Sequence, residues 1–441
     1  MLIKKIKNYF KPKFSEDKLW ENAVRLMPRG TQTLSKCPDQ FVDGVYPKFI
    51  KKSKGAYVKG LNNKWYLDYM CGLGPIILGY NHKRTNKAIM SELKKGIIHS
   101  LPTLLEQELA ELICEVVPCA EQVRFAKNGT DADLVAVRIA RSYTGREHIV
   151  KCGYHGWGDW HGVIMRDYGI PKSLKKIISE FEYNNLKSLE TELKKNKVAG
   201  VIMEAQALTA PEPGFLEGVR ELCTKYGALL IFDEVVTGFR WSLGGASEYY
   251  GVTPDLCCLG KAIANGMPLA AIAGKKEYMQ ELNHAFFSMT FGGECLSLAA
   301  AVETIKELKT KNYNHIWRLG NMLDSGIKEL AKKHNLKINF AGSAPRHNLS
   351  FDINESEFKN NQSSFIYKDP KGMKALFYQE MVKQGILFPN VIYISFAHTE
   401  KDIKKTLKAA DKAFKFVADN IDNIDKVLEG KKSIDIFRKN T

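Results

Sequence analysis

Two residues near the middle of the chain have the types and the setting that carbonyl–amine chemistry requires. Lys261 follows the apolar run 255–260, and Asp233 ends another apolar run earlier in the chain. A lysine amine can form a Schiff base with an aldehyde, and a carboxylate at a pyridine nitrogen keeps that nitrogen protonated, so that the ring accepts electrons. The pair therefore predicts an enzyme that uses pyridoxal 5'-phosphate, with Lys261 and Asp233 as its catalytic residues.

Two further segments follow predicted strands and could hold other parts of such a cofactor. Asn128-Gly129-Thr130 precedes a predicted helix, whose free N–H groups suit a phosphate, although these residue types also make an ordinary capping turn. Glycines flank Tyr154 and His155, so that turn can expose an aromatic face to a cofactor ring or pack in the core. Ligands of open parallel sheets bind beyond the carboxyl ends of the strands, where both segments fall.

The elements that must position these residues follow an alternating pattern. Helical periodicity over 130–143, 186–195 and 215–226 separates short apolar runs, which predicts a largely parallel sheet wrapped by helices. The predicted strands are Gln122–Ala126, His148–Cys152, Val198–Glu204, Ala228–Asp233, Asp255–Leu259 and Leu269–Gly274.

The pattern also predicts the division into domains. We expect an N-terminal segment, 1–54, that packs with a small domain at the other end of the chain. A large cofactor-binding α/β domain should follow over 55–310, opened by a lead-in hairpin and helix at 55–100. The small domain, 311–441, should be α+β, because strand and helix signals are mixed there.

Composition disfavours several classes of protein. No apolar run of the 441 residues reaches the roughly 18 needed to cross a membrane, and the N-terminus is a poor secretory signal. Nine cysteines without regular spacing predict reduced thiols in the cytoplasm. The net charge of +16 comes mostly from lysines on predicted solvent faces without interleaved aromatic residues, so we expect no binding to nucleic acid or to membranes.

Two other kinds of site are also disfavoured. A nicotinamide-binding loop would need Gly-x-Gly-x-x-Gly, whereas Gly72–Gly79 has another spacing and a proline, Pro75, where the helix should start. We expect no metal site, since the chain has no paired Cys-x-x-Cys and the spacing of His155 and His161 does not align them on one helix face. A non-catalytic scaffold remains an alternative that the loss of any cofactor signal would support.

The segments in this order resemble the fold-type I pyridoxal-phosphate enzymes. Within them the match is to class III aminotransferases, most closely the glutamate-1-semialdehyde aminomutase branch, and it extends over 28–408. The motifs that carry it are Leu-Asp-Tyr69 to Gly79-Tyr-Asn-His82, Tyr-His-Gly156, Asp-Glu-Val-Val-Thr-Gly-Phe-Arg240, and Leu-Gly-Lys-Ala262 with Gly266-Met-Pro268. The resemblance implies an α/β large domain with a mostly parallel seven-stranded sheet and a smaller α+β domain.

The resemblance also implies roles for matching residues. Lys261 would be the Schiff-base lysine and the acid/base, and Asp233 would hold the pyridine nitrogen. Val235 would pack on the cofactor ring and Tyr154 would stack over it. Thr290 would reach the phosphate of the neighbouring subunit, which implies a homodimer with a shared active site. The other implied cofactor contacts are Asn128, Gly129, Thr130, His155 and Glu204, although a structural role at a strand end is equally open for Glu204.

The substrate half of the pattern departs from the aminomutase. Lys36 stands where that branch has an arginine, Leu73 replaces an aromatic residue, and 388–398 lacks both the acid of the aminomutase and the late arginine of ω-aminotransferases. We therefore predict intermolecular amino transfer between a small-molecule amine and a polar or anionic carbonyl compound. The alternatives with this cofactor are the intramolecular shift of a 2,1-aminomutase, racemisation and decarboxylation. The candidate substrate-binding residues are Lys36, Leu73, Trp157 and Arg346.

Overall fold

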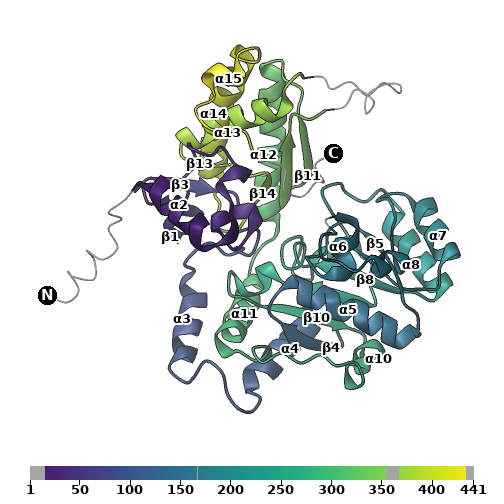
Figure 1. The fold of residues 1–441 in the computed structure, drawn as a ribbon. Helices are drawn as coiled ribbons and strands as arrows, with labels where there is room; N and C mark the ends of the chain where they lie inside the picture. Colours follow the sequence, from purple (N-terminus) through teal and green to yellow (C-terminus); the bar gives the residue numbers. More distant parts are fainter. Residues whose placement is uncertain (1–14, 166, 354–366, 434–441) are drawn as a thin grey trace.

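A seven-stranded sheet forms the centre of the larger of two lobes (Figure 1). The computed structural model describes residues 15–165, 167–353 and 367–433, and the N-terminal arm 1–14 lies outside them. In sheet order the strands are β4 (Gln122–Ala126), β10 (Ala270–Gly274), β9 (Leu256–Leu259), β8 (Leu229–Glu234), β7 (Val198–Met203), β5 (His148–Cys152) and β6 (Ile178–Glu180). Only β10 runs antiparallel to its neighbours, so the predicted mostly parallel seven-stranded sheet is confirmed.

Helices cover both faces of this sheet. Helix α5 (Gly129–Thr144) packs on one face, while α7 (Leu186–Lys195) and α8 (Phe215–Tyr226) pack on the other. Strands β7 and β8 are buried along their whole length, which is why their sequences are continuous apolar runs rather than alternating ones. Helices α4 (Leu104–Val116) and α11 (Cys295–Leu308) extend the cover beside β9 and β10.

The smaller lobe joins the two ends of the chain. Its three-stranded sheet has the order β11 (Asn339–Ser343), β12 (Arg346–Ser350) and β14 (Val391–Tyr393). A second sheet has the order β1 (Ile50–Lys54), β2 (Tyr57–Gly60), β3 (Trp65–Asp68) and β13 (Ile386–Leu387). Because β3 pairs with β13, part of the hairpin predicted as the lead-in to the large domain belongs to a sheet with the C-terminal residues. The boundary placed after residue 54 therefore does not follow the strand pairing.

The remaining elements complete the two lobes. Long helices α12 (Asn314–Lys333), α13 (Pro370–Lys383) and α14 (Glu400–Asp419) form the core of the small lobe. The other helices are α2 (Glu16–Leu26), α3 (Lys83–Leu93), α6 (Asp159–Met165), α9 (Gly245–Tyr250), α10 (Lys276–Met279) and α15 (Ile424–Val427). Among the described residues, no helix is both long and apolar enough to span a membrane.

Candidate active site

Asp233 and Lys261 meet at the carboxyl edge of two neighbouring parallel strands. In the β8–β9 pairing, Asp233 lies opposite Cys258, and Lys261 follows the end of β9. Lys261 has a φ of 42°, a left-handed conformation that turns the chain sharply as it leaves the strand. Parallel strands place their carboxyl ends on one edge of a sheet, so the two predicted catalytic residues come from adjacent positions.

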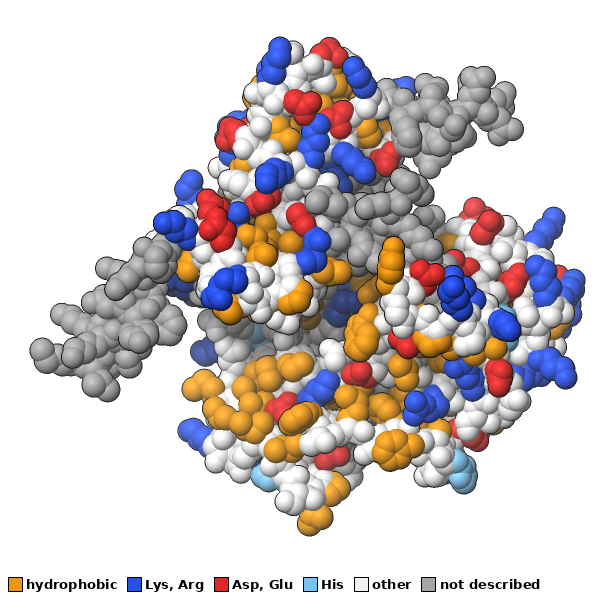
Figure 2. Space-filling model, viewed as in Figure 1, with side chains coloured by type: hydrophobic (Ala, Val, Ile, Leu, Met, Phe, Trp, Pro, Cys, Tyr) orange, Lys and Arg blue, Asp and Glu red, His pale blue; other side chains and the backbone are white. Residues whose placement is uncertain are grey.

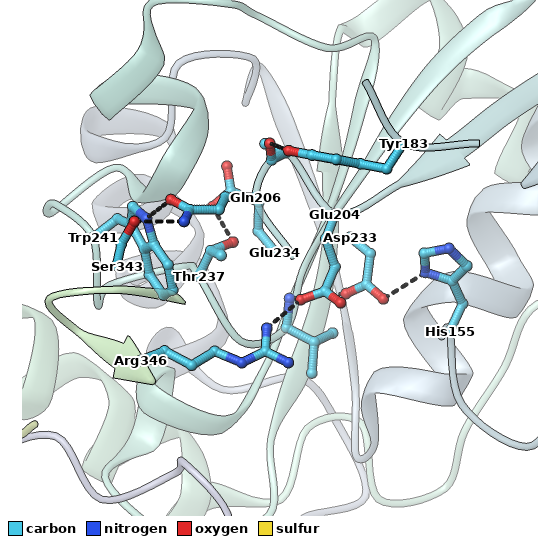
Figure 3. Close-up of polar contacts among 12 residues, drawn as sticks. His155, Tyr183, Glu204, Gln206, Asp233, Glu234, Thr237, Trp241, Ser343 and Arg346 are labelled. Atoms are coloured by element: carbon cyan, nitrogen blue, oxygen red, sulfur yellow. Dashed lines mark hydrogen bonds and ion pairs between the residues drawn. The ribbon is translucent and has the colours of Figure 1, made fainter. Parts of the chain in front are cut away.

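The side chain of Asp233 is buried and points toward the ring of His155 (Figure 3). His155 Nδ1 and Asp233 Oδ2 are 2.8 Å apart, and the backbone N–H of Val235 donates to the other carboxylate oxygen over 3.0 Å. The other ring nitrogen of His155 lies 3.0 Å from the carbonyl of Cys152, which can only accept. His155 thus bridges the Cys152 carbonyl through Nε2 and the Asp233 carboxylate through Nδ1.

Lys261 is half-buried and lies beside Gly74. Burial lowers the pKa of its ammonium group, and the carboxylates of Asp233 and Glu204 oppose that effect only in part. A side chain on Gly74 would bring its Cβ to 3.3 Å from Lys261 Cδ, so glycine at this position leaves room for the lysine stem. A lysine with a lowered pKa is a better nucleophile and base near neutral pH.

The predicted phosphate and ring contacts lie at the N-terminus of α5. Asn128 caps this helix reciprocally with Asp131, and the first N–H groups of an α-helix have no partner within the helix. A Cβ on Gly129 would come within 2.8 Å of the methyl groups of Val235, and a Cβ on Gly156 within 2.2 Å of Thr130 Oγ1. Glycine at these two positions thus leaves the N-terminus of α5 uncrowded.

The residues present fit the cofactor expected from the sequence. They supply an amine with a lowered pKa at Lys261, a buried carboxylate at Asp233, and an uncrowded helix N-terminus for a phosphate at Gly129. Val235 lies close to Gly129 and to Gly260, between the helix terminus and the lysine strand. Each part of pyridoxal phosphate thus has a matching protein group: the amine for its aldehyde, the carboxylate for its pyridine nitrogen, and the helix N-terminus for its phosphate.

An ion pair joins the two lobes beside these residues (Figure 3). Arg346 on β12 donates from Nη1 to Glu204 Oε2 over 2.7 Å, and both side chains are almost fully buried. Burial would lower the pKa of Arg346, but Glu204 outweighs it and holds the pKa above its ordinary value. Arg346, predicted for the substrate, and Glu204, predicted for the cofactor, are therefore partners at the lobe interface.

A second buried arginine is held without a carboxylate. Arg240 donates from Nη1 to the carbonyl of Ile394 over 2.7 Å, and from Nη2 to the carbonyls of Gly74 over 2.5 Å and Ile76 over 3.5 Å. Its guanidinium also lies 5.1 Å from the ring centroid of Tyr393. Arg240 thus ties the large lobe to the wall of the site.

The other predicted residues are less closely tied to this group. Tyr154 packs edge-on against His161 with 5.2 Å between the ring centroids. The Trp157 side chain is 77% exposed, although the backbone N–H of this residue donates to Thr130 Oγ1 over 3.4 Å. Leu73 is half-buried in the loop before Gly74, while Lys36 and Thr290 are exposed. No hydrogen bond or ion pair between described residues connects Lys36 or Thr290 with Lys261.

Some features of the site were not predicted from the sequence. The contact of His155 with Asp233 was missed because the two residues are far apart in the chain, and Tyr393 gave no signal beyond one tyrosine in a short strand. Arg240 ends the motif Asp-Glu-Val-Val-Thr-Gly-Phe-Arg240, but the sequence indicated no function for it. Among the residues whose placement is described, no group of three or more His, Cys, Asp or Glu side chains could hold a metal ion.

Comparison with known proteins gives the chain its family. The profile of the aminotransferase class-III family matches residues 42–342. A 3-aminobutyryl-CoA aminotransferase of Cloacimonas acidaminovorans is 35% identical, over 89% of this chain and 94% of that protein. A glutamate-1-semialdehyde 2,1-aminomutase of Bacillus licheniformis is 36% identical, over 90% of this chain and 97% of that protein.

A solved structure is similar over the same extent. The PLP internal aldimine form of the Sphingopyxis sp. MTA144 FumI protein superposes with a TM-score of 0.83 and is 26% identical, covering 92% of this chain and 97% of that one. Both lobes are thus shared, and the motifs around Asp233 and Lys261 lie within the matched region. The chain belongs to the class-III aminotransferases, which are pyridoxal-phosphate-dependent enzymes.

Proposed function

We propose that this enzyme transfers an amino group from a small-molecule amine to a separate polar or anionic carbonyl compound, with Lys261 and Asp233 as its catalytic residues. The observation that carries the proposal is their position on adjacent strand ends, with Asp233 bonded to His155. The chemistry that pyridoxal phosphate supplies when bound is an aldehyde that takes up amines and a ring that withdraws electrons.

Each residue of the group has a task in this proposal. The Lys261 amine, whose pKa is lowered by burial, removes and returns a proton at the carbon that bears the amino group. Asp233 holds the pyridine nitrogen in its protonated form, and His155 fixes the orientation of the Asp233 carboxylate. Asn128, Gly129 and Thr130 would hold the phosphate, and Val235 and Tyr154 would pack against the ring.

Transfer between two molecules is preferred to an internal shift because the substrate side differs from the aminomutase pattern. Lys36, Leu73 and Trp157 remain our candidates for substrate contacts, as does Arg346, whose charge adds to burial in lowering the pKa of Lys261. One relative is named as an aminotransferase and another as an aminomutase, so names alone do not separate the two reactions. The preference for transfer between two molecules therefore rests on the residues of the substrate side.

We also propose that the enzyme is a cytoplasmic homodimer. Apolar side chains gather on the face of the large lobe that Figure 2 shows, which supports the dimer. We call the exposed residues of two loops the apolar strip: Ile97, Ile98, Leu101, Leu104, Phe286 and Phe291. Cys295 N–H donates to the carbonyl of Ile97 over 2.8 Å, which brings the two loops of the strip together. Thr290 is exposed on the second loop, where it could reach the phosphate of a partner subunit. The nine free cysteines agree with a reducing compartment.

Two measurements test the proposal. Borohydride reduction of the loaded protein and peptide mapping should place the cofactor label on Lys261, and a label on another lysine would refute the assignment. Amines labelled with nitrogen-15 are then offered one at a time together with carbonyl compounds. Nitrogen-15 should appear in the second molecule, whereas rearrangement of a single compound without an acceptor would establish the aminomutase reaction instead.

A further inference from the structure

Tyr393, the last residue of β14, stands beside Lys261. An ideal Cβ on Gly74 would lie 3.3 Å from Lys261 Cδ and equally 3.3 Å from Tyr393 Cζ. Because both atoms lie so close to one point, the end of the tyrosine ring and the stem of the lysine border the same space. Tyr393 is 6% exposed and belongs to the small lobe, whereas Lys261 belongs to the large one.

The position of the Tyr393 ring is fixed by its surroundings. Its backbone N–H donates to the carbonyl of Tyr69 over 2.8 Å, and its own carbonyl accepts from Cys71 Sγ over 3.6 Å. Arg240 covers the ring with its guanidinium. The tyrosine is therefore held in one orientation before any ligand binds, as a recognition group should be.

The hydroxyl of Tyr393 differs from those of other buried tyrosines. Tyr46 donates its hydroxyl to the carbonyl of Phe388 over 3.0 Å, and Tyr378 donates to the carbonyl of Pro389 over 3.1 Å. The Tyr393 hydroxyl makes no hydrogen bond to any residue within 15–165, 167–353 or 367–433. Among the described residues the Tyr393 oxygen is not one of the fully buried polar atoms without a partner, so it faces accessible space. A ligand in that space can therefore supply the hydrogen bond that a tyrosine hydroxyl normally makes.

A second donor without a partner lies on the same side of the sheet. Arg346 is directly opposite Tyr393 in the antiparallel pairing of β12 and β14, so their side chains project from one face. Glu204 occupies Nη1 of Arg346, whereas its Nε–H is buried and bonded to none of the described residues. Glu204 thus anchors one edge of the guanidinium and leaves another available.

We propose that Tyr393 is a specificity-determining residue whose hydroxyl, together with the Nε–H of Arg346, binds an acidic group of the carbonyl substrate. This inference rests on the proposed function and names its substrate class, a carbonyl compound bearing a carboxylate or a phosphate. The Arg346 Nε–H can only donate and the tyrosine hydroxyl can donate as well, so an oxyanion that accepts from both suits the pair. Hydrogen bonds to a charged oxygen are also stronger than those to a neutral one.

The test uses Tyr393→Phe, which removes the hydroxyl and keeps the ring beneath Arg240. Titration calorimetry on the cofactor-loaded protein measures the Kd of succinate and of glycerol 3-phosphate, and the tighter of the two identifies the acid. In Tyr393→Phe that Kd should rise about tenfold or more, because one hydrogen bond to a charged group is lost. The Tm should not fall, since the hydroxyl has no internal bond to lose.

Tyr46→Phe is the matched control. It removes a buried hydroxyl that bonds within the protein, so the Tm should fall while the Kd of both acids stays unchanged. An unchanged Kd in Tyr393→Phe would overturn the inference, as would a wild-type protein that binds neither acid. Borohydride labelling of Lys261 separates this failure from failure of the proposed function, because the label persists when only the acid subsite is wrong.

Discussion

Asp233 and Glu234 are neighbours in sequence that strand β8 directs to different environments. The Asp233 carboxylate faces His155, while Glu234 turns to the other side and accepts from the N–H groups of Ala246 and Ser247 over 2.6 and 2.7 Å. Glu234 therefore holds the start of helix α9, and only Asp233 can serve a ligand. Alternation of side chains along a strand produces this division.

The two substitutions Asp233→Asn and Glu234→Gln should consequently fail in different ways. Asp233→Asn removes the charge that holds a pyridine nitrogen protonated, so kcat/KM should fall by about 10²–10³-fold or more with little change in Tm. Glu234→Gln replaces a buried acceptor of two backbone bonds, so the Tm should fall first. Steady-state kinetics and thermal unfolding on both variants measure this, and equal losses of activity at equal Tm would contradict the assignment.

Lys261 should also make the stability of the cofactor-free protein depend on pH. Its pKa is below 10.5 in the folded chain, so between the lowered value and 10.5 the unfolded state binds more protons than the folded state. Stability contributed by this residue then rises with pH. Lys261→Met removes the buried amine, so the variant should be more stable than wild type near pH 7, and the difference should shrink toward pH 10.5. Urea unfolding of both proteins across this range tests it, and a constant difference would contradict it.

Residue types were enough to place Asp233, Lys261 and Gly129 at or just after strand ends, because each stands at the end of a recognisable apolar run. They were not enough to predict His155 as the partner of Asp233 or Tyr393 as a neighbour of Lys261. Those contacts depend on which strands lie side by side. A sequence pattern gives strand ends but not the spatial order that brings them together.

At the scale of elements, an unusual turn forms the wall between the lobes. Cys71, Gly72, Leu73 and Gly74 all have positive φ, from 50° to 97°, and the Gly74 N–H donates to the carbonyl of Met70 over 3.2 Å. A left-handed turn of this length costs about 1–2 kcal/mol at each residue other than glycine. The carboxylate of Asp68, which accepts from the N–H groups of Met70 and Cys71, helps to hold it.

Gly74→Ala tests whether the space at this turn serves Lys261. Alanine there is strained by φ and also comes to 3.3 Å from the lysine stem, so the variant should lose about 1–2 kcal/mol of stability and most of its cofactor labelling. Gly214→Ala is the control, since Gly214 has a φ of 81° but no atom within 4 Å of an added Cβ. It should lose similar stability and keep normal labelling. Denaturant unfolding and borohydride labelling provide the two readouts.

Elements that were missed share a physical reason. Strand β6 has three residues, Ile178-Ser-Glu180, and contains no apolar run that could announce it. Strand β13 has two residues and exists because β3 offers a parallel edge. Helix α6 follows the glycine-rich turn and lacks a long apolar stripe. Each depends on an adjacent element rather than on its own sequence.

At the scale of the whole molecule, the apolar strip predicts assembly. Leu104 is 83% and Phe291 60% exposed in a single chain, and apolar surface of this kind is normally covered. Wild type should therefore sediment at twice 49.8 kDa, whereas the double variant Leu104→Asp with Phe291→Asp should sediment as a monomer. The monomer should bind pyridoxal phosphate more weakly, since Thr290 of the second subunit is lost.

Trp65→Asp is the control for assembly, because Trp65 is 41% exposed on β3 but belongs to the other lobe, where the ammonium groups of Lys52 and Lys59 lie over its ring. It should remain a dimer with unchanged cofactor affinity. Sedimentation equilibrium and fluorescence titration with the cofactor measure both properties. A monomeric wild type, or a dimeric double variant, would refute the shared site.

The carbonyls held by Arg240 have a consequence for how the protein is made. They belong to Gly74, Ile76 and Ile394, so one guanidinium joins segments synthesised near the beginning, the middle and the end of translation. A chain still on the ribosome that lacks Ile394 cannot complete this arrangement, and the wall next to Lys261 closes only as the last strands emerge.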